Sequence, residues 1–473
     1  VGSNRTIHYK CCRSVMRLPA VFLAHRWRTL FIYKFRPGIC STPPGRTSRT
    51  PHQAGQEGRE RPDIIGTSPC FGSGCYCRPW QHRRCGNRPC HGRTGCDIRM
   101  WVSALVGMAT KYHEGVLAIM YKGTDDKGNP RGGPMHIITR GLGTKWTPLA
   151  KFFAVAGLFG TLCIMNANQL TEAFMTTFTT PEGVASNSFL SNVGGYLGLD
   201  NVRTYRLLFG AAIAVIVGAV ILGGIKRIAR VATIMVPFMV GLYFPMVLFI
   251  IITNIEGVPG VFKSIFAEAF NLRAGFGALA GIAIIGARRA ALVNDAGIGT
   301  ASIMHGASRN NQPVREGLIA MLGPSIDSGP VCTLTAVAIL LCGDINVDGV
   351  KGLEVAMKAF SNGIPAGDIL LMCIVVCFAM SSMFSYSFYG TTCANYLFGT
   401  RKGRYYSWAF LASLVVFAVV PLEAAVGACD LFYALMAIPT MTAVLFPSPK
   451  VRKATKEYFD KMDKGSEKTN SES

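Results

Sequence analysis

The sequence predicts an all-α polytopic membrane protein, and three observations lead to this fold class. Half of the 473 residues are hydrophobic, only 16% are charged, and the mean hydropathy is positive at +0.32. An ordinary soluble domain does not have this balance. After about position 100 the apolar residues gather in stretches of roughly 20, the length that a helix needs to cross a bilayer. One of these stretches is interrupted by a polar segment that contains two glycines.

The net charge of +22 comes mainly from the first part of the chain. Residues 1–100 contain 18 Lys and Arg against four Asp and Glu, so they account for +14. The remaining +8 is ordinary for a membrane protein with basic cytoplasmic loops, and we expect no nucleic-acid partner. Nine of the 16 cysteines also precede position 100. The other seven stand singly in apolar stretches, where thiols act as small hydrophobic groups.

Residues 1–99 differ from the rest of the chain. They are rich in Arg, Pro, Gly, Cys and His, and they contain no stretch long enough to cross a bilayer. A zinc module would need ligand pairs at short regular spacing, and a disulfide framework would need an oxidising compartment. The spacing of the candidate ligands is irregular, and no signal peptide is evident. These ligands are Cys70, Cys75, Cys77, Cys85, Cys90, His91 and Cys96.

We favour a third interpretation, in which residues 1–99 are a frameshifted segment that replaces the first transmembrane helices. When the codons are read one base later, Trp80 followed by Gln81 forces a glycine, and Gln81 followed by His82 permits only Asn or Ser. The shifted frame admits the apolar string A-L-A-A-T-V-G-P-G-N-I-A-G-V-A-T-A-L-A-M-G-G-P-G-A-I-F. This string leads directly into the hydrophobic run that starts at Met100.

From Met100 onward the hydropathy pattern predicts nine spans. They lie at 100–121, 152–174, 207–223, 231–253, about 274–307, 318–342, 368–390, 408–427 and 431–446. We expect a short interfacial helix at 255–270 and a second amphipathic stretch at 350–362. Towards the end of the first span we interpret Lys111, His113 and Glu114 as groups that reach the membrane interface.

Basic residues predict the orientation. Lys and Arg concentrate at every second connection and in the tail, at 122–145, 226–230, 309–315, 401–404 and 450–464. By the positive-inside rule these segments are cytoplasmic, so we expect a plasma-membrane protein, in the bacterial inner membrane, with its carboxyl terminus inside. The expected regions are the segment 1–99, a transmembrane core at 100–447 and a charged, disordered cytoplasmic tail at 448–473.

The stretch 288–301 is the most informative part of the core. Gly297 and Gly299 each weaken a helix by roughly 1 kcal/mol relative to Ala. A break at membrane depth persists only where protein or a wet cavity receives the freed main-chain groups. A glycine-rich loop between two helices is the simpler alternative, but the polar Asn294 and Thr300 lie within one turn of the glycines and favour a broken helix. Broken helices around a central cavity are typical of the binding sites of secondary transporters.

Further polar side chains lie inside predicted spans. Gln169 can both donate and accept a hydrogen bond. The span 368–390 carries several hydroxyl groups, and a spacing of four places Ser382 and Tyr386 on one face. The alternative for such serines, Ser381 included, is a hydrogen bond to the preceding turn of their own helix. Asp327 fits a structural acid, and its role stays open.

Several function classes lack their motifs. The chain has no Gly-x-x-x-x-Gly-Lys-Ser/Thr sequence, so ATP is not expected to drive it directly. It also shows no His/Glu zinc motif and no catalytic triad, so we expect no enzyme and no cofactor. An ion channel or a non-transporting membrane sensor remains the competing class. A channel would show a filter motif, and a sensor would carry a sizeable soluble domain.

Five segments resemble the alanine/glycine:cation symporters, which are sodium-dependent amino-acid carriers. They are R-R-A-A-L-V-N-D-A-G-I-G-T-A-S-I at 288–303, R-E-G-L-I-A-M-L-G-P-S-I-D-S at 315–328, G-G-P-M at 132–135, Y-G-T-T-C-A-N-Y-L-F-G at 389–399 and C-D-L-F-Y-A-L-M-A-I-P-T at 429–440. The resemblance covers essentially all of 100–460. The string G-P-G-N-I-A-G of the shifted frame also resembles the first broken core helix of that family.

The resemblance implies a LeuT-like inverted-repeat transporter fold with discontinuous helices. It also implies a sodium ion as the coupling ion and alanine or glycine as the substrate, bound in the middle of the bilayer. The residues that would then contact the substrate are Gln169, Asn294, Gly297, Ile298, Gly299 and Tyr386. Those that would contact sodium are Ser381 and Ser382.

Four positions or segments depart from the family pattern. Ser382 stands where the family often has a threonine, Tyr386 where it often has a tryptophan, and Asp295 where it has a glutamate. The first broken helix is missing from the chain as written. We therefore expect that this chain does not transport until its reading frame is restored.

Overall fold

The computed structural model describes residues 96–471 apart from 125–127, 129, 163, 179–182, 185–186, 270–293 and 343–352. The chain divides into two compact units, one made of Ile65–Thr455 and the other of Val1–Ile64 with Lys456–Ser473. The membrane-spanning segments and the candidate site all belong to the unit Ile65–Thr455. The frameshift prediction for residues 1–95 and the first part of the predicted broken span, 274–293, lie outside the described residues.

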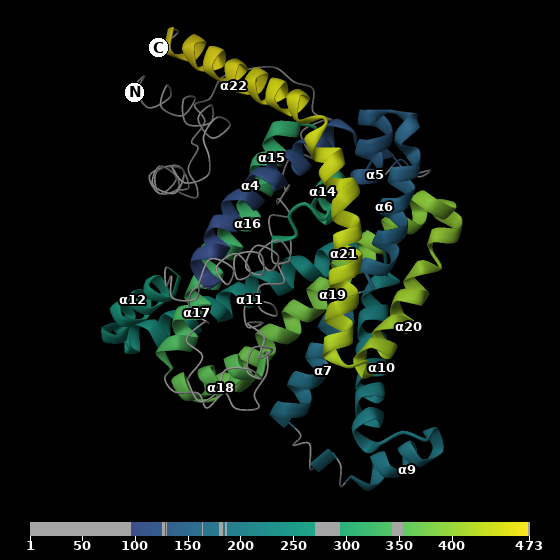
Figure 1. Cartoon of the computed structure of the whole chain (residues 1–473), viewed down its shortest axis with the longest axis vertical. Coiled ribbons are helices and arrows are strands. Elements are labelled where there is room, and N and C mark those ends of the chain that lie inside the picture. Colours follow the sequence, from purple (N-terminus) through teal and green to yellow (C-terminus); the bar gives the residue numbers. More distant parts are fainter. Residues whose placement is uncertain are drawn as a thin grey trace, which may run out of the picture. The chain divides into compact units, whose positions relative to one another are not determined.

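The described chain is almost entirely helical (Figure 1). Its α-helices are α4 (Cys96–Met120), α5 (Pro134–Ile137), α6 (Thr147–Gly160), α7 (Ile164–Phe178), α9 (Ser188–Leu197), α10 (Asn201–Ile221), α11 (Ile225–Thr253), α12 (Val258–Ala269), α14 (Thr300–Gly306), α15 (Pro313–Ala320), α16 (Leu322–Ile326), α17 (Cys332–Leu341), α18 (Leu353–Gly363), α19 (Gly367–Gly403), α20 (Tyr406–Val419), α21 (Leu422–Leu445) and α22 (Ser448–Ser471).

Short elements fill some of the connections. Two-residue strands, β1 (Gly123–Thr124) and β2 (Pro130–Arg131), pair antiparallel with Gly123 opposite Arg131. Turns of π-helix occur at Ile138–Leu142 and Asp327–Val331, and turns of 3-10 helix occur at Thr144–Trp146 and Ile255–Gly257.

Six described segments are long and apolar enough to cross a membrane. They are Thr144–Met175, Asn201–Ile221, Arg227–Thr253, Pro313–Leu341, Gly367–Gly403 and Ala424–Leu445. Each covers most of a different predicted span, so six of the nine predicted spans are confirmed. Helix α4 covers the predicted first span, and the shorter apolar helix α20 lies in another. The protein is therefore a mostly helical, multi-pass membrane protein.

Three interruptions were not expected from hydropathy. The predicted span 152–174 is divided between α6 and α7, and the span 318–342 contains the π-helical turn with Pro330. The span predicted at 408–427 is wrong in its second half, because α20 ends at Val419 and Pro421 precedes α21. Val420 is extended there, the conformation that a following proline enforces. Hydropathy averages across such a proline and does not detect it.

The carboxyl-terminal tail was predicted to be disordered, and this was wrong for most of its length. Residues Ser448–Ser471 form the helix α22. Lys and Glu are frequent in this segment, and both are good helix formers in water. A low apolar content therefore does not prevent local helix formation.

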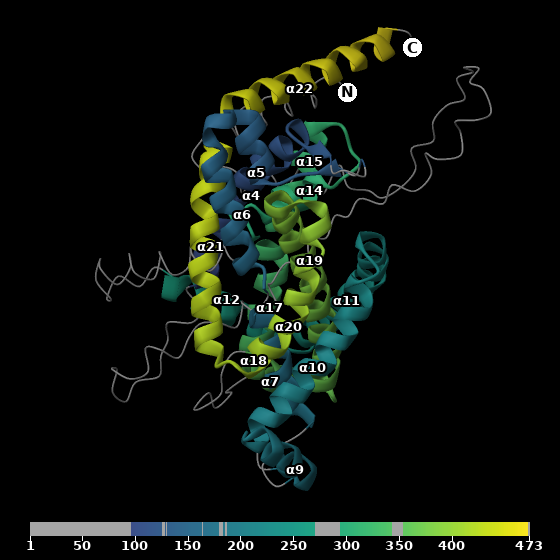
Figure 2. The same cartoon turned by 90° about the vertical axis from the view of Figure 1, so that its right-hand side faces the viewer.

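The helices that position the candidate site pack against one another as follows. Helix α4 packs against α14, α15 and α16, and α19 packs against α6, α7 and α11. Helix α21 runs alongside α6 in both views (Figures 1 and 2) and also contacts α4. The half-helix α14 contacts both α4 and α19.

Residues 130–134, which precede and begin α5, contact both α14 and α19. A Cβ atom on Gly306 would lie 2.2 Å from the Cα atom of Gly132, so two glycines let the main chains touch. On the other side, Arg131 donates to the hydroxyl of Thr392 over 3.3 Å and lies 5.8 Å from the ring centre of Phe388. The connection therefore holds both helices at once.

We predict that Gly306→Ala lowers the melting temperature of the detergent-solubilised protein. The added methyl group has no room against Gly132, and overpacking of this kind costs about 1–3 kcal/mol. Gly260→Ala in α12 is the matched control, because a Cβ atom there meets nothing within 4 Å and alanine favours a helix. Equal melting temperatures for the two variants would contradict the close contact.

We also predict a pH-dependent stability that originates at His136. Burial, with Arg140 and Arg131 nearby, lowers the pKa of His136 from 6.5 to about 4, and its ring lies edge-on to Tyr396 at 5.6 Å. As the pH decreases, the imidazole of His136 is protonated in the unfolded chain before it is protonated in the folded protein. The free energy of unfolding therefore falls as the pH decreases from about 6.5 towards 4. His136→Phe should keep the ring contact and flatten the decline in melting temperature between pH 7 and 5. An unchanged decline would refute this origin.

Candidate functional site

The described part of the predicted broken span begins with Asn294, which is helical, followed by five residues of irregular main chain, 295–299. We call the segment 294–299 the break. Asp295, Gly297 and Gly299 all have left-handed φ angles, of 46°, 80° and 95°. Helix α14 starts directly afterwards at Thr300. An interruption at this position is therefore confirmed. The choice between a broken helix and a loop between two helices depends on residues 274–293 and stays open.

The two glycines allow neighbouring helices to approach the break closely. A Cβ atom on Gly297 would lie 2.2 Å from the terminal methyl carbon of Met441 in α21. One on Gly299 would lie 2.5 Å from Pro134 Cγ and 2.8 Å from Phe153. Both positions thus require glycine for the left-handed conformation, and Gly299 also requires it for lack of space, whereas the flexible Met441 side chain could move away from position 297.

Side chains of the protein receive main-chain groups that the break frees. The N–H of Gly297 donates to Glu114 Oε1 over 2.6 Å, and Thr440 donates to the carbonyl oxygen of Ile298 over 3.1 Å. Unpaired groups of this kind cost several kcal/mol in hydrocarbon. The prediction that protein atoms would receive them is confirmed for these two groups.

The interfacial interpretation of Glu114 was wrong. Its side chain is 0% exposed and points from α4 to the break. The sequence contained one signal for this role, because a charged residue within an apolar span usually faces the protein interior. Its nearness in sequence to Lys111 and His113 favoured the interface instead, but a helix places neighbouring residues on different faces.

Asn294 is held at the start of the break. It is 1% exposed, and its Oδ1 accepts a hydrogen bond of 2.6 Å from Ser328. Its Nδ2 atom is buried and has no hydrogen-bond partner among the described residues. Ser328 follows Asp327 in the π-helical turn, so this turn aligns a donor with the break.

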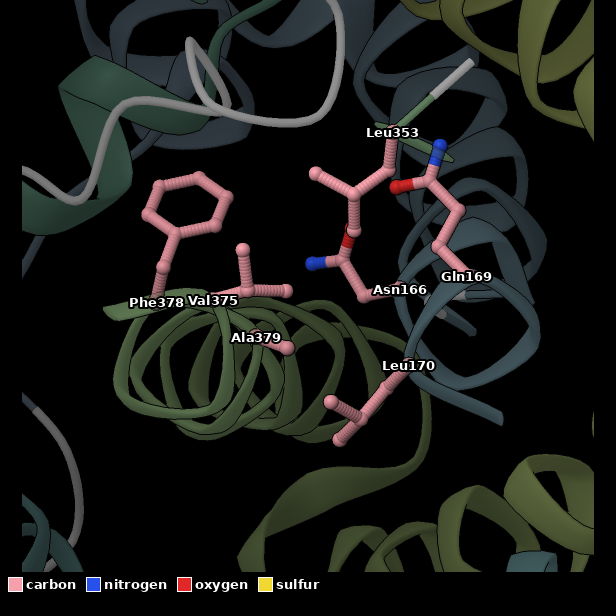
Figure 3. A pocket seen from close by; sticks show the side chains of 7 residues that line it. All are labelled: Asn166, Gln169, Leu170, Leu353, Val375, Phe378 and Ala379. Carbon is pink, nitrogen blue, oxygen red and sulfur yellow. The ribbon is translucent and has the colours of Figure 1, made fainter. Parts of the chain in front are cut away.

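A small pocket contains the predicted Gln169 (Figure 3). It is lined by Asn166, Gln169 and Leu170 from α7, by Leu353 from α18, and by Val375, Phe378 and Ala379 from α19. The amide groups of Asn166 and Gln169 extend from α7 into the same space. Asn166 Nδ2 is buried without a partner among the described residues. The pocket therefore combines apolar walls with two amides.

The hydroxyl groups of α19 differ in their partners. Ser381 donates to the carbonyl oxygen of Phe378 over 2.9 Å, which is the hydrogen bond to the preceding turn that we considered. Ser382, in contrast, is 1% exposed, and its Oγ atom has no partner among the described residues. Tyr386 is buried and lies edge-on to Tyr389, with 5.7 Å between the ring centres. Ser382 is thus the hydroxyl with free capacity for a ligand.

The predicted site residues therefore form two groups. Asn294, Gly297, Ile298 and Gly299 pack against α4, α6 and α21. Gln169 and the serines belong to the α7–α19 side. The groups lie on neighbouring elements, since α14 and α19 contact each other.

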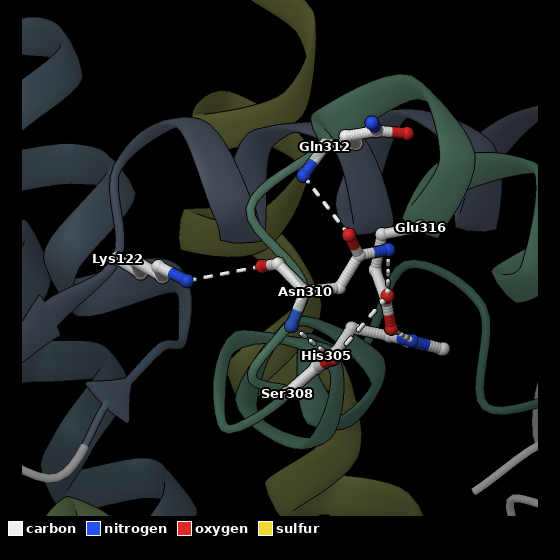
Figure 4. Close-up of polar contacts among 6 residues, drawn as sticks. All are labelled: Lys122, His305, Ser308, Asn310, Gln312 and Glu316. Carbon is white, nitrogen blue, oxygen red and sulfur yellow. Dashed lines mark hydrogen bonds and ion pairs between the residues drawn. The ribbon is translucent and has the colours of Figure 1, made fainter. Parts of the chain in front are cut away.

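A polar network anchors the connection from α14 to α15 (Figure 4). Glu316 is 6% exposed, and its carboxylate lies 2.7 Å from His305 Nδ1 and accepts from Asn310 over 3.1 Å. Lys122 donates to the carbonyl oxygen of Asn310 over 3.0 Å. Hydropathy did not indicate this network, because it follows apolar stretches and not the contacts among polar side chains of a connection or with Lys122, which is 188 residues from Asn310.

The sequence matches one known family over most of its length. Residues 90–472 fit the profile described as "Sodium:alanine symporter family". The chain belongs to this family. The resemblance inferred from its motifs is thereby confirmed.

Similar proteins are also named as transporters. The chain is 35% identical over 372 residues to the sodium/alanine symporter AgcS of Methanococcus maripaludis, an alignment that covers 78% of each protein. It is 30% identical over 370 residues to the probable sodium/glutamine symporter GlnT of Bacillus subtilis, over 78% of this chain and 72% of that protein. An uncharacterized transporter of Haemophilus influenzae is 33% identical over 382 residues, which is 78% of each. These similarities indicate a membrane transporter, not an enzyme.

Proposed function

We propose that this protein is a sodium-coupled symporter for alanine or glycine. The observation that carries the proposal is the family match across 90–472. The names of the relatives include alanine in one and glutamine in another, so the family alone does not select the amino acid. A small substrate is supported by the crowding around Gly299, which leaves little room beside the break. A channel has no comparable support from the relatives.

We further propose a LeuT-like inverted-repeat arrangement with discontinuous helices. Three features support it: the break at 294–299, the interruption between α6 and α7, and the π-helical turn Asp327–Val331. Irregular main chain inside a membrane protein is tolerated where protein or a cavity receives it, and transporters of this type bind their ligands there.

For the substrate we propose the residues Gln169, Asn294, Gly297, Ile298, Gly299 and Tyr386. The buried amide of Asn294 and the half-buried amide of Gln169 can pair with the carboxylate and ammonium groups of an amino acid. For sodium we propose Ser381 and Ser382. Ser382 has the stronger support, because its buried Oγ atom has no described partner and a ligand would satisfy it. Ser381 donates its proton to its own helix and keeps its oxygen lone pairs for a cation. No other cofactor is proposed.

For the organisation of the chain we propose a frameshifted segment at 1–99, the transporter core at 100–447 and a cytoplasmic tail at 448–473. The shifted-frame string supports the first assignment, and the alternation of basic loops supports a carboxyl terminus inside the cell. Sequencing the 5′ end of the gene tests the frame directly.

We predict sodium-driven uptake of alanine or glycine by the frame-restored protein in proteoliposomes. An inward sodium gradient should raise the initial rate of uptake at least tenfold over a matched potassium gradient, because a symporter couples the entry of sodium to the entry of the amino acid. The chain as written should show background rates. Uptake by the chain as written would overturn the frameshift proposal, and absence of sodium-driven uptake in both chains would overturn the proposed function.

We predict that Ser382→Ala raises the sodium concentration for half-maximal uptake about tenfold, which corresponds to about 1.4 kcal/mol. Loss of one oxygen ligand has this effect when nothing replaces it. Ser381→Ala should have a smaller effect, and Ser385→Ala, whose hydroxyl donates to Ser381 O over 3.1 Å, should have none. A sodium dependence that is equal in the Ser382 and Ser385 variants would argue against Ser382 as a ligand.

A further inference from the structure

The hydrogen bond from Gly297 to Glu114 crosses between two elements that are 183 residues apart in sequence. In a regular helix the N–H of Gly297 would donate to a carbonyl oxygen four residues earlier, and the break removes this arrangement. The carboxylate of Glu114 accepts it instead, over 2.6 Å.

The position of Glu114 is determined by close packing of α4. A Cβ atom on Gly107, two turns earlier, would lie 3.3 Å from Asn294 Nδ2. On Gly115 it would lie 2.9 Å from the Cβ atom of Ala320 in α15. Glycines thus let α4 approach both the break and α15, and the side chain between them has little freedom to move.

The second oxygen of Glu114 has a different environment. Glu114 Oε2 is buried and has no hydrogen-bond partner among the described residues, and the same holds for Asp295 Oδ1 in the break. The main chain of Ser302 in α14 also hydrogen-bonds to the Glu114 carboxyl group, and Lys111, one turn earlier on α4, interacts electrostatically with both carboxyl groups. Ionisable groups are costly inside a membrane protein, and those that occur there usually have a function.

We propose that Glu114 is a positioning residue for transport: its carboxylate replaces the missing main-chain acceptor at the break and holds Gly297 in its left-handed conformation. This sets the direction in which the chain enters α14 and the placement of Asn294 to Gly299 beside it. The proposal rests on the proposed function, because its effect on transport depends on the break being part of the substrate site.

Three variants separate the acceptor oxygen from other properties of the side chain. Glu114→Gln keeps the length and one acceptor oxygen, Glu114→Leu fills similar space without an acceptor, and Glu114→Asp keeps the charge but is too short. Tyr112→Phe is the matched control. It removes a buried hydrogen bond of 2.6 Å, between Tyr112 and Thr455, from the same helix without touching the break.

Hydrogen exchange of the full chain in detergent tests the local effect independently of transport. The peptide that covers 294–306 should exchange at least tenfold faster in Glu114→Leu and in Glu114→Asp than in the parent protein. It should stay within about threefold of the parent in Glu114→Gln and in Tyr112→Phe. If Glu114→Leu does not fold, as judged by size-exclusion chromatography, Glu114→Asp carries the comparison.

Alanine uptake in the frame-restored chain tests the consequence. Glu114→Leu or Glu114→Asp should raise the KM for alanine about tenfold with Vmax within about twofold, and Glu114→Gln should restore most of the affinity. Unchanged exchange in both Leu and Asp variants would overturn the proposal, as would a Gln variant as impaired as Leu. Absence of sodium-driven uptake in the parent protein would overturn the proposed function alone, because the exchange comparison does not use transport.

Discussion

Main-chain polar groups that leave a helix inside a membrane need partners from the protein, and this requirement governs the region around the break. The N–H of Gly297 and the carbonyl oxygen of Ile298 are released from helical pairing, and Glu114 and Thr440 receive them. These partners come from α4 and α21, which precede and follow the break in sequence by more than a hundred residues. An irregular segment of five residues, 295–299, thereby makes the positions of two long helices interdependent.

The structure around the break also requires neighbouring helices to approach one another closely, and this depends on small residues. Gly132 meets Gly306, and Gly115 meets Gly317, at distances that no side chain would permit. Packing of small residues is a main source of helix association in membranes, where the lipid offers no hydrophobic driving force. The first contact connects α14 to the segment that also holds α19 through Arg131. A displacement of α14 would therefore change the packing against α19, the helix that carries Ser382.

The arrangement is consistent with the family to which the chain belongs. One group of candidate residues surrounds the break, and the other lies where α7 faces α19 around the amides of Asn166 and Gln169. Relatives at similar identity carry names with different amino acids. Membership of the family therefore does not by itself select the amino acid.

The sequence by itself determined the class of the protein, the positions of six spans, the interruption near Gly297 and the family. Apolar stretches of membrane length, paired glycines and motif strings are local properties, so no tertiary information was needed. Only the tertiary structure decided the contact of Glu114 with the break and the difference between Ser381 and Ser382. The first depends on which distant element faces the side chain, and the second on the hydrogen bond that each hydroxyl makes or lacks. Pro421 was missed because hydropathy averages over a window, whereas the restriction that proline imposes acts on a single residue.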